Sequence, residues 1–272
     1  MIYDLHSHSD RSDGDLAPAE LLGRARLQGV GALAVTDHDT VAAYRALPRE
    51  PEGITLIPGI ELSTTWKSLT VHVLGLNIDP DSDAMATATR LQTEARMRRA
   101  EQIGARLARQ GIEGAFEGAL ALAGGGFIGR PHFARHLVET GRVATMADAF
   151  DRYLGAGRAG DVRDHWAELP RVIAWIRDAG GIAVLAHPLK YKLTRTRLKR
   201  LLGDFMAAGG EGMEVVSGRQ PEYRTRDLGR LCAAMGLLAS LGSDFHRPGM
   251  PWAELGATGP LPSAVAPVWD RF

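Results

Sequence analysis

The chain has almost no cysteine, no long apolar run and no excess of charge of either sign. Of its 272 residues only Cys232 is a cysteine, so an intramolecular disulfide is excluded and a reducing compartment is expected. No apolar run is long enough for a transmembrane helix. Asp4, His6 and His8 interrupt any apolar segment that a signal peptide would need. We therefore predict a cytoplasmic protein with no cleaved leader and no membrane partner.

The charge balance and the apolar content limit the class of protein. Lys and Arg total 32 and Asp and Glu also total 32, so neither a strongly basic nucleic-acid binder nor an acidic disordered chain is indicated. Hydrophobic residues make up 45% of the chain, which is enough for one barrel-sized domain or for one domain with an insertion. The 32 glycines, many of them between apolar runs, are typical of a loop-rich catalytic face.

Short apolar runs that end in polar residues alternate along the chain with helical patterns. We predict strands at residues 1–8, 30–39, 53–61, 68–76, 180–188, 210–218 and 236–246. Helices are predicted at residues 17–29, 40–47, 168–180 and 220–236. Strands that alternate with helices indicate βαβ units and a parallel sheet. At least seven such strands favour an α/β barrel over an open sheet.

The segment from about residue 81 to 165 departs from this alternation. It has helical periodicity throughout, with one long helix predicted at 83–111 and shorter ones around 117–124, 130–141 and 145–155. We predict a helical insertion that caps the mouth of the barrel. The predicted organisation is a first part of the barrel at 1–90, the insertion at 91–165 and a second part of the barrel at 166–272.

Ionisable residues recur at the predicted strand ends. Six of the nine histidines have this placement, as do three carboxylates: His6, His8, His38, His72, His187, His246, Asp13, Glu61 and Asp244. In a β/α barrel the C-terminal strand ends form the active-site face, so these residues are expected to converge. The other three histidines lie in the insertion and are interpreted as ordinary residues rather than metal ligands: His132, His136 and His165.

The chemistry of this set indicates a metal site. His6 and His8 are two residues apart, as are Asp244 and His246, so each pair points to one side of its strand. Neutral imidazole and carboxylate are ligands for Zn²⁺, Mn²⁺ or Fe²⁺. A single histidine on a strand, such as His72, is commonly a structural residue. The recurrence of the pattern favours a metal centre, because burying so many such groups without cations would be costly.

An ordered set of motifs carries a family resemblance. "DLHSHSDRSDG", "AVTDHDT", "PGIELS", the isolated His72, "AHP" and "GSDFH" resemble, in this order, the motifs of the PHP (polymerase and histidinol phosphatase) family across residues 4–246. The resemblance implies a distorted seven-stranded (β/α) barrel with a trinuclear centre of divalent metal ions, with Mn²⁺ expected first and Zn²⁺ or Fe²⁺ as alternatives. It implies the metal ligands His6, His8, Asp13, His38, Glu61, His72, His187, Asp244 and His246. Because none of them is missing, an active enzyme is expected rather than a non-catalytic metal-binding module.

The helical insertion narrows the resemblance to a subgroup. The stretch "GGGFIGRPHFARHL", residues 124–137, is similar to stand-alone phosphoesterases that act on nucleotides. We predict a hydrolase of phosphoric esters that removes the 3′-phosphate from nucleoside 3′,5′-bisphosphates. The alternatives are a 5′→3′ exoribonuclease acting on short 5′-phosphorylated RNA and a phosphomonoesterase like histidinol phosphatase. The expected partners are thus a small phosphorylated nucleotide or a short RNA.

The predicted mechanism divides the site into two halves. A metal-bound hydroxide, held through Glu61, His187 and Asp244, is the nucleophile, with Glu61 as the bridging carboxylate. Substrate contacts are predicted for Arg130, Arg135, His132 and Lys190. The first three lie at the start of a helix that is predicted to have Pro131 at its first position, where free N–H groups and flanking arginines favour phosphate. The general acid is left open between Asp37, Asp39 and the ligand histidines.

Two basic stretches lie outside this site prediction. They are residues 90–109 and 190–200, and both have the composition that can attract polyanions. Charge runs on helices are usually solvated faces, and this interpretation is preferred for both stretches. Lys190 is the exception, because it follows closely after His187.

Overall fold

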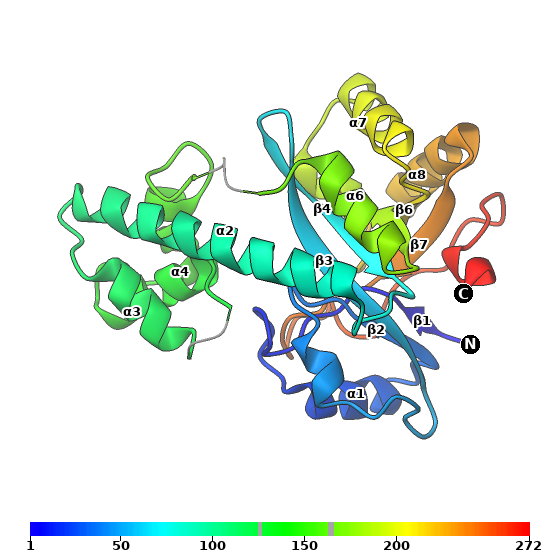
Figure 1. The fold of residues 1–272 in the computed structure, drawn as a ribbon, viewed down its shortest axis with the longest axis horizontal. Coiled ribbons are helices and arrows are strands. Elements are labelled where there is room, and N and C mark those ends of the chain that lie inside the picture. Colours follow the sequence, from blue (N-terminus) through cyan, green and yellow to red (C-terminus); the bar gives the residue numbers. More distant parts are fainter. Residues whose placement is uncertain (125–126, 163–165) are drawn as a thin grey trace.

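A seven-stranded sheet forms the body of the protein in the computed structural model, which describes residues 1–124, 127–162 and 166–272 (Figure 1). In spatial order the strands are β1 (Tyr3–Asp4), β2 (Ala32–Val35), β3 (Thr55–Trp66), β4 (Leu69–Leu76), β5 (Ile182–Leu185), β6 (Gly212–Ser217) and β7 (Leu238–Gly242). The ends of the sheet meet, because the Leu5 N–H donates to the Leu241 carbonyl at 3.1 Å and the Asp244 N–H to the His6 carbonyl at 2.8 Å. The predicted barrel-like α/β fold is confirmed.

The prediction of a parallel sheet is wrong for one strand. β4 runs antiparallel to both β3 and β5, whereas the remaining neighbours are parallel. Only Lys67 and Ser68 separate β3 from β4, and a parallel connection would need a crossover of a dozen or more residues. His72 therefore reaches the active end of the barrel from the first half of its strand, where it pairs with Ser63.

Helices cover the outside of the barrel. They are α1 (Pro18–Leu27), α6 (Leu169–Asp178), α7 (Arg195–Ala207) and α8 (Glu222–Met235), with short 3₁₀ turns η1 (Ala42–Arg45), η3 (Pro188–Tyr191) and η4 (Val268–Arg271). The helix predicted at 40–47 is thus only one 3₁₀ turn, because the Tyr44 hydroxyl binds the carbonyls of Val35 and Ile57 and fixes the segment against β2 and β3. Among the described helices, none has the length and apolarity needed to cross a bilayer.

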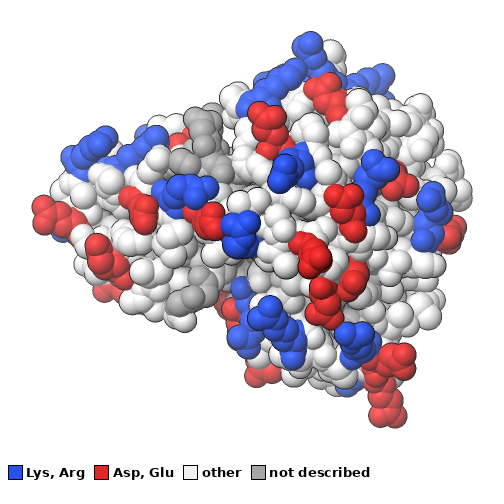
Figure 2. Space-filling view, in the orientation of Figure 1, with Lys and Arg blue, Asp and Glu red and all other residues white. Residues whose placement is uncertain are grey.

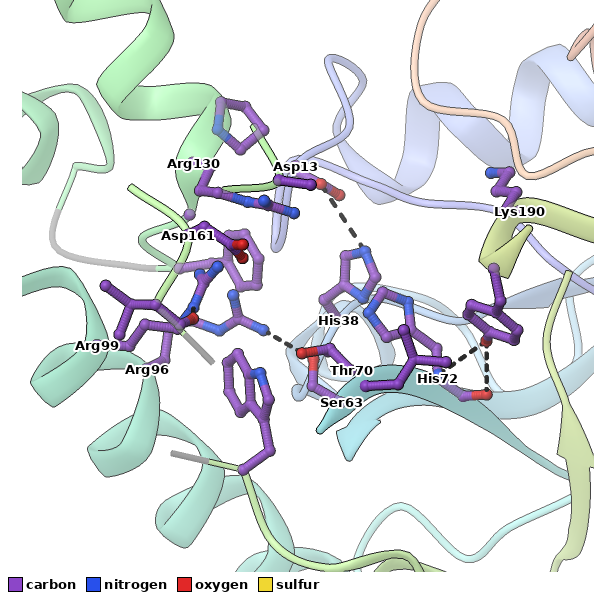
Figure 3. Close-up of a pocket in the computed structure, with 18 of the residues that line it drawn as sticks. Asp13, His38, Ser63, Thr70, His72, Arg96, Arg99, Arg130, Asp161 and Lys190 are labelled. Carbon is purple, nitrogen blue, oxygen red and sulfur yellow. Dashed lines mark hydrogen bonds and ion pairs between the residues drawn. The ribbon is translucent and has the colours of Figure 1, made fainter. Parts of the chain in front are cut away.

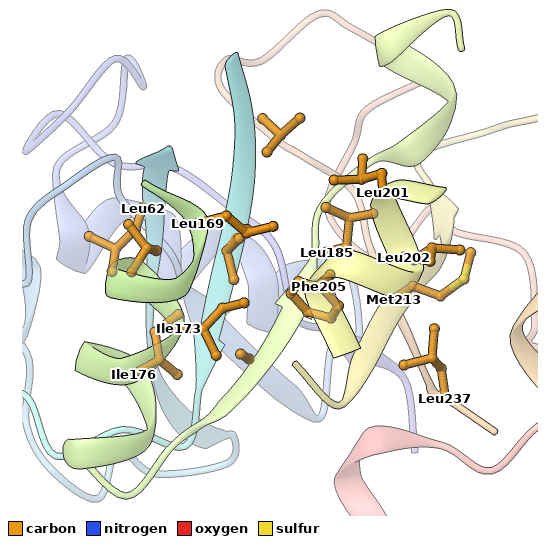
Figure 4. Close-up of a cluster of buried hydrophobic side chains, with 14 of the residues drawn as sticks. Leu62, Leu169, Ile173, Ile176, Leu185, Leu201, Leu202, Phe205, Met213 and Leu237 are labelled. Atoms are coloured by element: carbon orange, nitrogen blue, oxygen red, sulfur yellow. The ribbon is translucent and has the colours of Figure 1, made fainter. Parts of the chain in front are cut away.

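The main core lies between the sheet and α6, α7 and α8. Leu62 and Leu185 point from the sheet toward Ile173 of α6 and Phe205 of α7, and all four side chains are buried (Figure 4). Complete burial of a side chain of this size stabilises the fold by about 1.5–3 kcal/mol. This packing holds the strand ends, and the loops that follow them, in fixed positions.

The insertion forms a second helical body beside the barrel (Figure 1). It consists of α2 (Asp83–Ala108), α3 (Ala115–Leu122), α4 (Arg130–Glu139), α5 (Met146–Ala149) and the π-helical turn η2 (Phe150–Leu154). The long α2 belongs to both bodies, since Met85 packs in the barrel core and Ile103 in a separate core with Phe133. The boundary predicted between residues 90 and 91 falls inside this helix.

Candidate metal centre

All nine predicted ligands lie at one end of the barrel. His6 and His8 follow β1, and a parallel bridge joins His38, after β2, to Glu61 on β3. The remaining ligands come from β4, from the segments after β5 and β7, and from the loop after β1: His72, His187, Asp244, His246 and Asp13. The convergence expected from strand ends is therefore found in the structure.

Glu61 occupies the middle of this set. Its Oε2 lies 3.2, 3.3 and 3.1 Å from nitrogens of His6, His8 and His38. Its Oε1 lies 2.9 Å from Nδ1 of His72 and 2.9 Å from Nε2 of His187. One carboxylate thus faces five imidazoles, three on one oxygen and two on the other. This is the arrangement that a bridging ligand requires.

Two aspartates complete the polar lining. Oδ1 of Asp244 lies 3.4 Å from Nε2 of His6 and 3.4 Å from Nε2 of His8. Oδ1 of Asp13 lies 3.4 Å from Nε2 of His246, and its Oδ2 lies 3.8 Å from Nε2 of His38. Neither aspartate approaches Glu61 as a partner, so the carboxylates alternate with imidazoles around the centre.

The donor set fits divalent cations. Several of its nitrogen and oxygen atoms are fully buried and, among the described residues, have no hydrogen-bond partner: His6 Nε2, His8 Nδ1 and Nε2, Asp13 Oδ1, His38 Nδ1, Glu61 Oε2 and His187 Nδ1. Such unsatisfied buried atoms are rare in folded proteins and are explained when an ion binds them. The nine residues also form overlapping groups whose ligand atoms lie within 4.8 Å of one another.

The backbone is strained where two of these residues leave their strands. Asp244 has φ 55° and His187 has φ 27°, in the left-handed region that non-glycine residues avoid. The neighbouring Asp39 has φ 55° as well. Strain of this kind persists only where the surrounding structure enforces it, and it is concentrated at functional sites.

Comparison with known proteins identifies the family. The PHP domain model matches residues 4–171. The chain belongs to the PHP domain family. A 5′-3′ exoribonuclease Rnm from Salmonella typhimurium is 47% identical, over 100% of this chain and 94% of that protein. A 3′,5′-nucleoside bisphosphate phosphatase from Chromobacterium violaceum is 43% identical, over 99% and 95%. A solved amidohydrolase structure from C. violaceum, with bound sulfate and no metal, has a TM-score of 0.90 and 41% identity, covering 100% of this chain and 95% of that one.

Electrostatics in this PHP centre act differently on its imidazoles. Burial lowers the pKa of His38 to about 3 and that of His187 to about 4, so both rings are neutral at physiological pH. Burial also lowers the pKa of His6, but the carboxylates of Glu214 and Glu61 outweigh it and raise the pKa to about 10. A proton or a cation is therefore strongly favoured beside His6.

Glu214 is a site residue that the sequence reasoning missed. It is fully buried on β6, accepts a 3.0 Å hydrogen bond from Nδ1 of His6, and accepts the N–H of His187 at 2.6 Å. The β6–β7 register shifts between Glu214 and Val216, a bulge of the kind that redirects side chains near active sites. The available signal was a glutamate in the apolar run "GMEVVS". Glu214 orients His6 as an outer carboxylate.

Glu214→Gln is expected to weaken metal binding about 10–100-fold, the usual cost of losing an outer partner of a ligating histidine. The amide keeps the size of the side chain but loses the charge that holds the His6 ring. A calorimetric titration of the metal-free protein with Mn²⁺ measures the change in metal affinity. The control is Glu211→Gln, a half-buried neighbour whose carboxylate lies near Arg271 and not at the centre. Equal affinities in the two variants would show that Glu214 does not orient His6.

A cavity of about 500 Å³ opens beside the centre. Figure 3 shows three arginines on one side of His38 and His72, and Lys190 on the other. The arginines are Arg96, Arg99 and Arg130. The structure therefore places two predicted substrate residues, Arg130 and Lys190, at this cavity, and the Lys190 ammonium contacts the Asp244 carboxylate.

The interpretation of residues 90–109 as a solvated face is wrong for two arginines. Arg96 and Arg99 are only 7% and 9% exposed. The Arg96 guanidinium lies between the rings of Phe127 and Trp166, at 3.8 and 4.7 Å from their centroids. The signal was the spacing: Gln92, Arg96 and Arg99 are four and three residues apart, which places them on one helix face. On that face Arg96 contacts Asp39 of the barrel and Arg99 donates to the Val162 carbonyl, so both charges are buried.

His132 and Arg135 line a neighbouring cavity rather than the one beside the centre. Nδ1 of His132 accepts the Gly129 N–H at 3.2 Å and caps α4, whose second residue, and not its first, is Pro131. Arg135 lies 4.0 Å from Asp15. His136 faces Gly118 within the insertion, and His165 lies outside the described residues.

Asp37 and Asp39 hold the loops of the centre in place. Asp37 accepts the Ser9 N–H at 2.8 Å and the hydroxyls of Ser9 and Ser12, both at 2.6 Å. Asp39 accepts the Ser63 N–H at 2.7 Å and forms a buried ion pair with Arg96. With their oxygens engaged in this way, both carboxylates position the loop that carries His38.

Proposed function

We propose that this PHP protein is a metal-dependent phosphoesterase that removes the 3′-phosphate from nucleoside 3′,5′-bisphosphates. The observation that carries the proposal is that the candidate metal centre and the arginine cluster line one cavity. Its volume of about 500 Å³ is in the range of small-ligand sites. A nucleotide with two phosphates can place one at the centre and the other on the arginines.

The nine residues of the centre are proposed to hold the ions, with Mn²⁺ expected and Zn²⁺ or Fe²⁺ as alternatives. Glu61 joins the two halves of the set, since each of its oxygens faces different imidazoles. The chemistry supplied by bound divalent cations is polarisation of phosphoryl oxygens and activation of water. The family resemblance implies three ions, and metal analysis of the purified protein tests this number.

The arginine cluster is proposed to bind the phosphate that is not cleaved. Burial, together with the charges of Arg130 and Arg96, lowers the pKa of Arg99 to about 9. Like charges crowded in a partly buried cavity are relieved when an anion binds between them. Guanidinium groups also match phosphate oxygens with paired hydrogen bonds. Lys190, on the other side of the centre, is proposed to contact the phosphoryl group that reacts.

The relatives support this class of reaction. The C. violaceum protein is named for hydrolysis of nucleoside bisphosphates, and the Salmonella protein for exoribonuclease activity. Both activities are hydrolysis of a phosphoric ester. The similar C. violaceum structure contains bound sulfate, an anion that resembles phosphate. A histidinol-phosphatase-like activity would leave the arginine cluster without a function.

An exoribonuclease activity is the second proposal, and it can use the same site. Removal of a 3′-phosphate breaks the bond between phosphorus and the 3′ oxygen. If the 5′-phosphate of an RNA is held on the arginines, hydrolysis of the first linkage breaks the same bond. The basic residues 190–200, which begin at the cavity with Lys190, favour this second activity.

The Mn²⁺-loaded protein is expected to release phosphate from a nucleoside 3′,5′-bisphosphate with a kcat/KM about 10–100-fold above that for the 3′-monophosphate. The reason is that a charge-assisted phosphate contact contributes roughly 1.5–3 kcal/mol. A panel of mono- and bisphosphates, assayed for inorganic phosphate, measures this ratio.

Arg99→Gln is expected to lower the ratio, whereas Arg109→Gln, at the exposed end of α2, should leave it unchanged. Comparable turnover of a 5′-monophosphate would contradict the proposal. If Arg99→Gln left the ratio unchanged, the arginine cluster would not be the site that binds the second phosphate. Product analysis on a 5′-phosphorylated trinucleotide separates the two activities, since successive mononucleotides indicate the exoribonuclease.

A further inference from the structure

The most basic stretch of the surface begins at the mouth of the cavity. Between residues 189 and 200 there are six basic side chains and no acidic one: Lys190, Lys192, Arg195, Arg197, Lys199 and Arg200. Lys190 and Lys192 line the cavity, and α7 starts at Arg195. A chain spans at most about 3.6 Å per residue, so Arg195 lies within roughly 11 Å of Lys192. The basic run is therefore continuous with the site.

The side chains of the four basic residues of α7 form no polar contact within the described part of the chain that would stabilise the fold: Arg195, Arg197, Lys199 and Arg200. All four are exposed, and none of them has an ion-pair partner among the residues that the structure describes. The first turn of α7 contains arginines and no acidic residue, although positive charge is unfavourable at the N-terminus of a helix. Figure 2 shows Lys and Arg side chains along the edge of the molecule where α7 lies. An external polyanion would use these charges.

Two exposed aromatic residues lie in segments that follow other strands of the barrel. Tyr223, at the start of α8, is 51% exposed, and Trp252, in the segment after β7, is 57% exposed. Tyr223 follows β6, which pairs with β5, and Trp252 follows β7, which pairs with β6, so both segments begin at the same end of the barrel as the metal centre. Exposed aromatic rings beside positive charge are typical of surfaces that bind single-stranded nucleic acid, because bases stack on the rings.

We propose that residues 192–200 bind the downstream part of an RNA whose first nucleotide occupies the active site. The inference rests on the proposed function, with the 5′-phosphate on the arginines and the first linkage at the metal centre. A water oxygen forms the new bond to phosphorus, the bond to the 3′ oxygen breaks, and that oxygen takes up a proton. The phosphate stays on the next nucleotide as its 5′-phosphate. The remaining RNA must therefore leave the centre on the side opposite the arginines, where Lys190 lies (Figure 3).

The triple variant Arg195→Gln, Arg197→Gln, Arg200→Gln tests the surface. Its kcat/KM on a 5′-phosphorylated decaribonucleotide is expected to fall about tenfold or more, with the log–log salt slope reduced by about one for each lost phosphate contact. Its turnover of a nucleoside 3′,5′-bisphosphate should stay unchanged, because that substrate does not reach α7. The control is a triple variant of exposed arginines elsewhere: Arg26→Gln, Arg109→Gln and Arg177→Gln.

Equal losses on both substrates, or no loss on either, would overturn the proposal. A membrane would be the partner instead if phosphatidylserine vesicles retained the wild-type protein but not the triple variant, while the kinetics on RNA were the same for both proteins. That result would also overturn the proposal. Fluorescence anisotropy of the labelled decaribonucleotide with metal-free protein measures binding without cleavage. This measurement tests the surface even if the protein does not hydrolyse nucleoside bisphosphates. Trp252→Ala should weaken binding of the same RNA.

Discussion

Glu61→Gln is expected to abolish metal-dependent hydrolysis and most metal binding. The amide has nearly the same shape as the carboxylate, but it removes the negative charge that faces five imidazoles at 2.9–3.3 Å. It also turns one oxygen into an N–H donor that cannot ligate a cation. Because the two oxygens of Glu61 face different histidines, the loss of metal affinity should exceed the roughly 100-fold expected when a residue that only orients a ligand, such as Glu214, is changed.

Thermal unfolding with and without Mn²⁺ measures this effect independently of activity. A ligand at 100 times its Kd stabilises the native state by about 2.7 kcal/mol. For a chain of this size, that energy raises Tm by roughly 5–10 °C. Wild-type protein should show this increase and Glu61→Gln should not, while the exposed Glu222→Gln serves as control. A variant that keeps the increase would exclude Glu61 as a ligand.

The convergence of the ligands was predictable because it depends on local pattern alone. An apolar strand that ends in a histidine or carboxylate is visible in the sequence, and the barrel brings all such ends to one face. The direction of β4 was less visible, because an apolar run looks the same in either direction. The signal was the short gap between the predicted strands, residues 62–67, because a parallel connection needs a crossover of a dozen or more residues.

Residues that act through long-range pairs were beyond sequence reasoning. Glu214 lies 208 residues from His6, and nothing near it in the chain indicates that contact. Arg96, on α2, and Asp39, after β2, are 57 residues apart. A charge run on a helix is usually solvated, but Arg96 is buried by its contacts with Asp39 and Ser63, and Arg99 by its contacts with Val162 and Trp166. Such pairs require the tertiary structure.

Arg96→Met is expected to lower the free energy of unfolding by about 3–5 kcal/mol, the typical cost of leaving one partner of a buried ion pair unpaired. The substitution leaves the Asp39 carboxylate buried, with Gln92 and Ser63 as its remaining donors. Urea unfolding measures the loss, with the exposed Arg98→Met as control. The double variant Arg96→Met, Asp39→Asn should recover much of it, because it contains no unpaired charge.

The difference in stability between wild type and Arg96→Met should depend on pH. Burial raises the pKa of Asp39, but the charge of Arg96 outweighs it and holds the pKa below its usual value of 3.8. A carboxyl group with a lowered folded pKa contributes stability above its unfolded pKa, and loses it as the pH falls through the folded value. In Arg96→Met the unpaired carboxyl takes up a proton at a higher pH. The difference in stability between wild type and variant should therefore be largest near neutral pH and shrink on acidification. A difference that is constant from pH 7 to pH 4 would mean that Arg96 stabilises α2 through its aromatic contacts instead, and the double variant would then recover nothing.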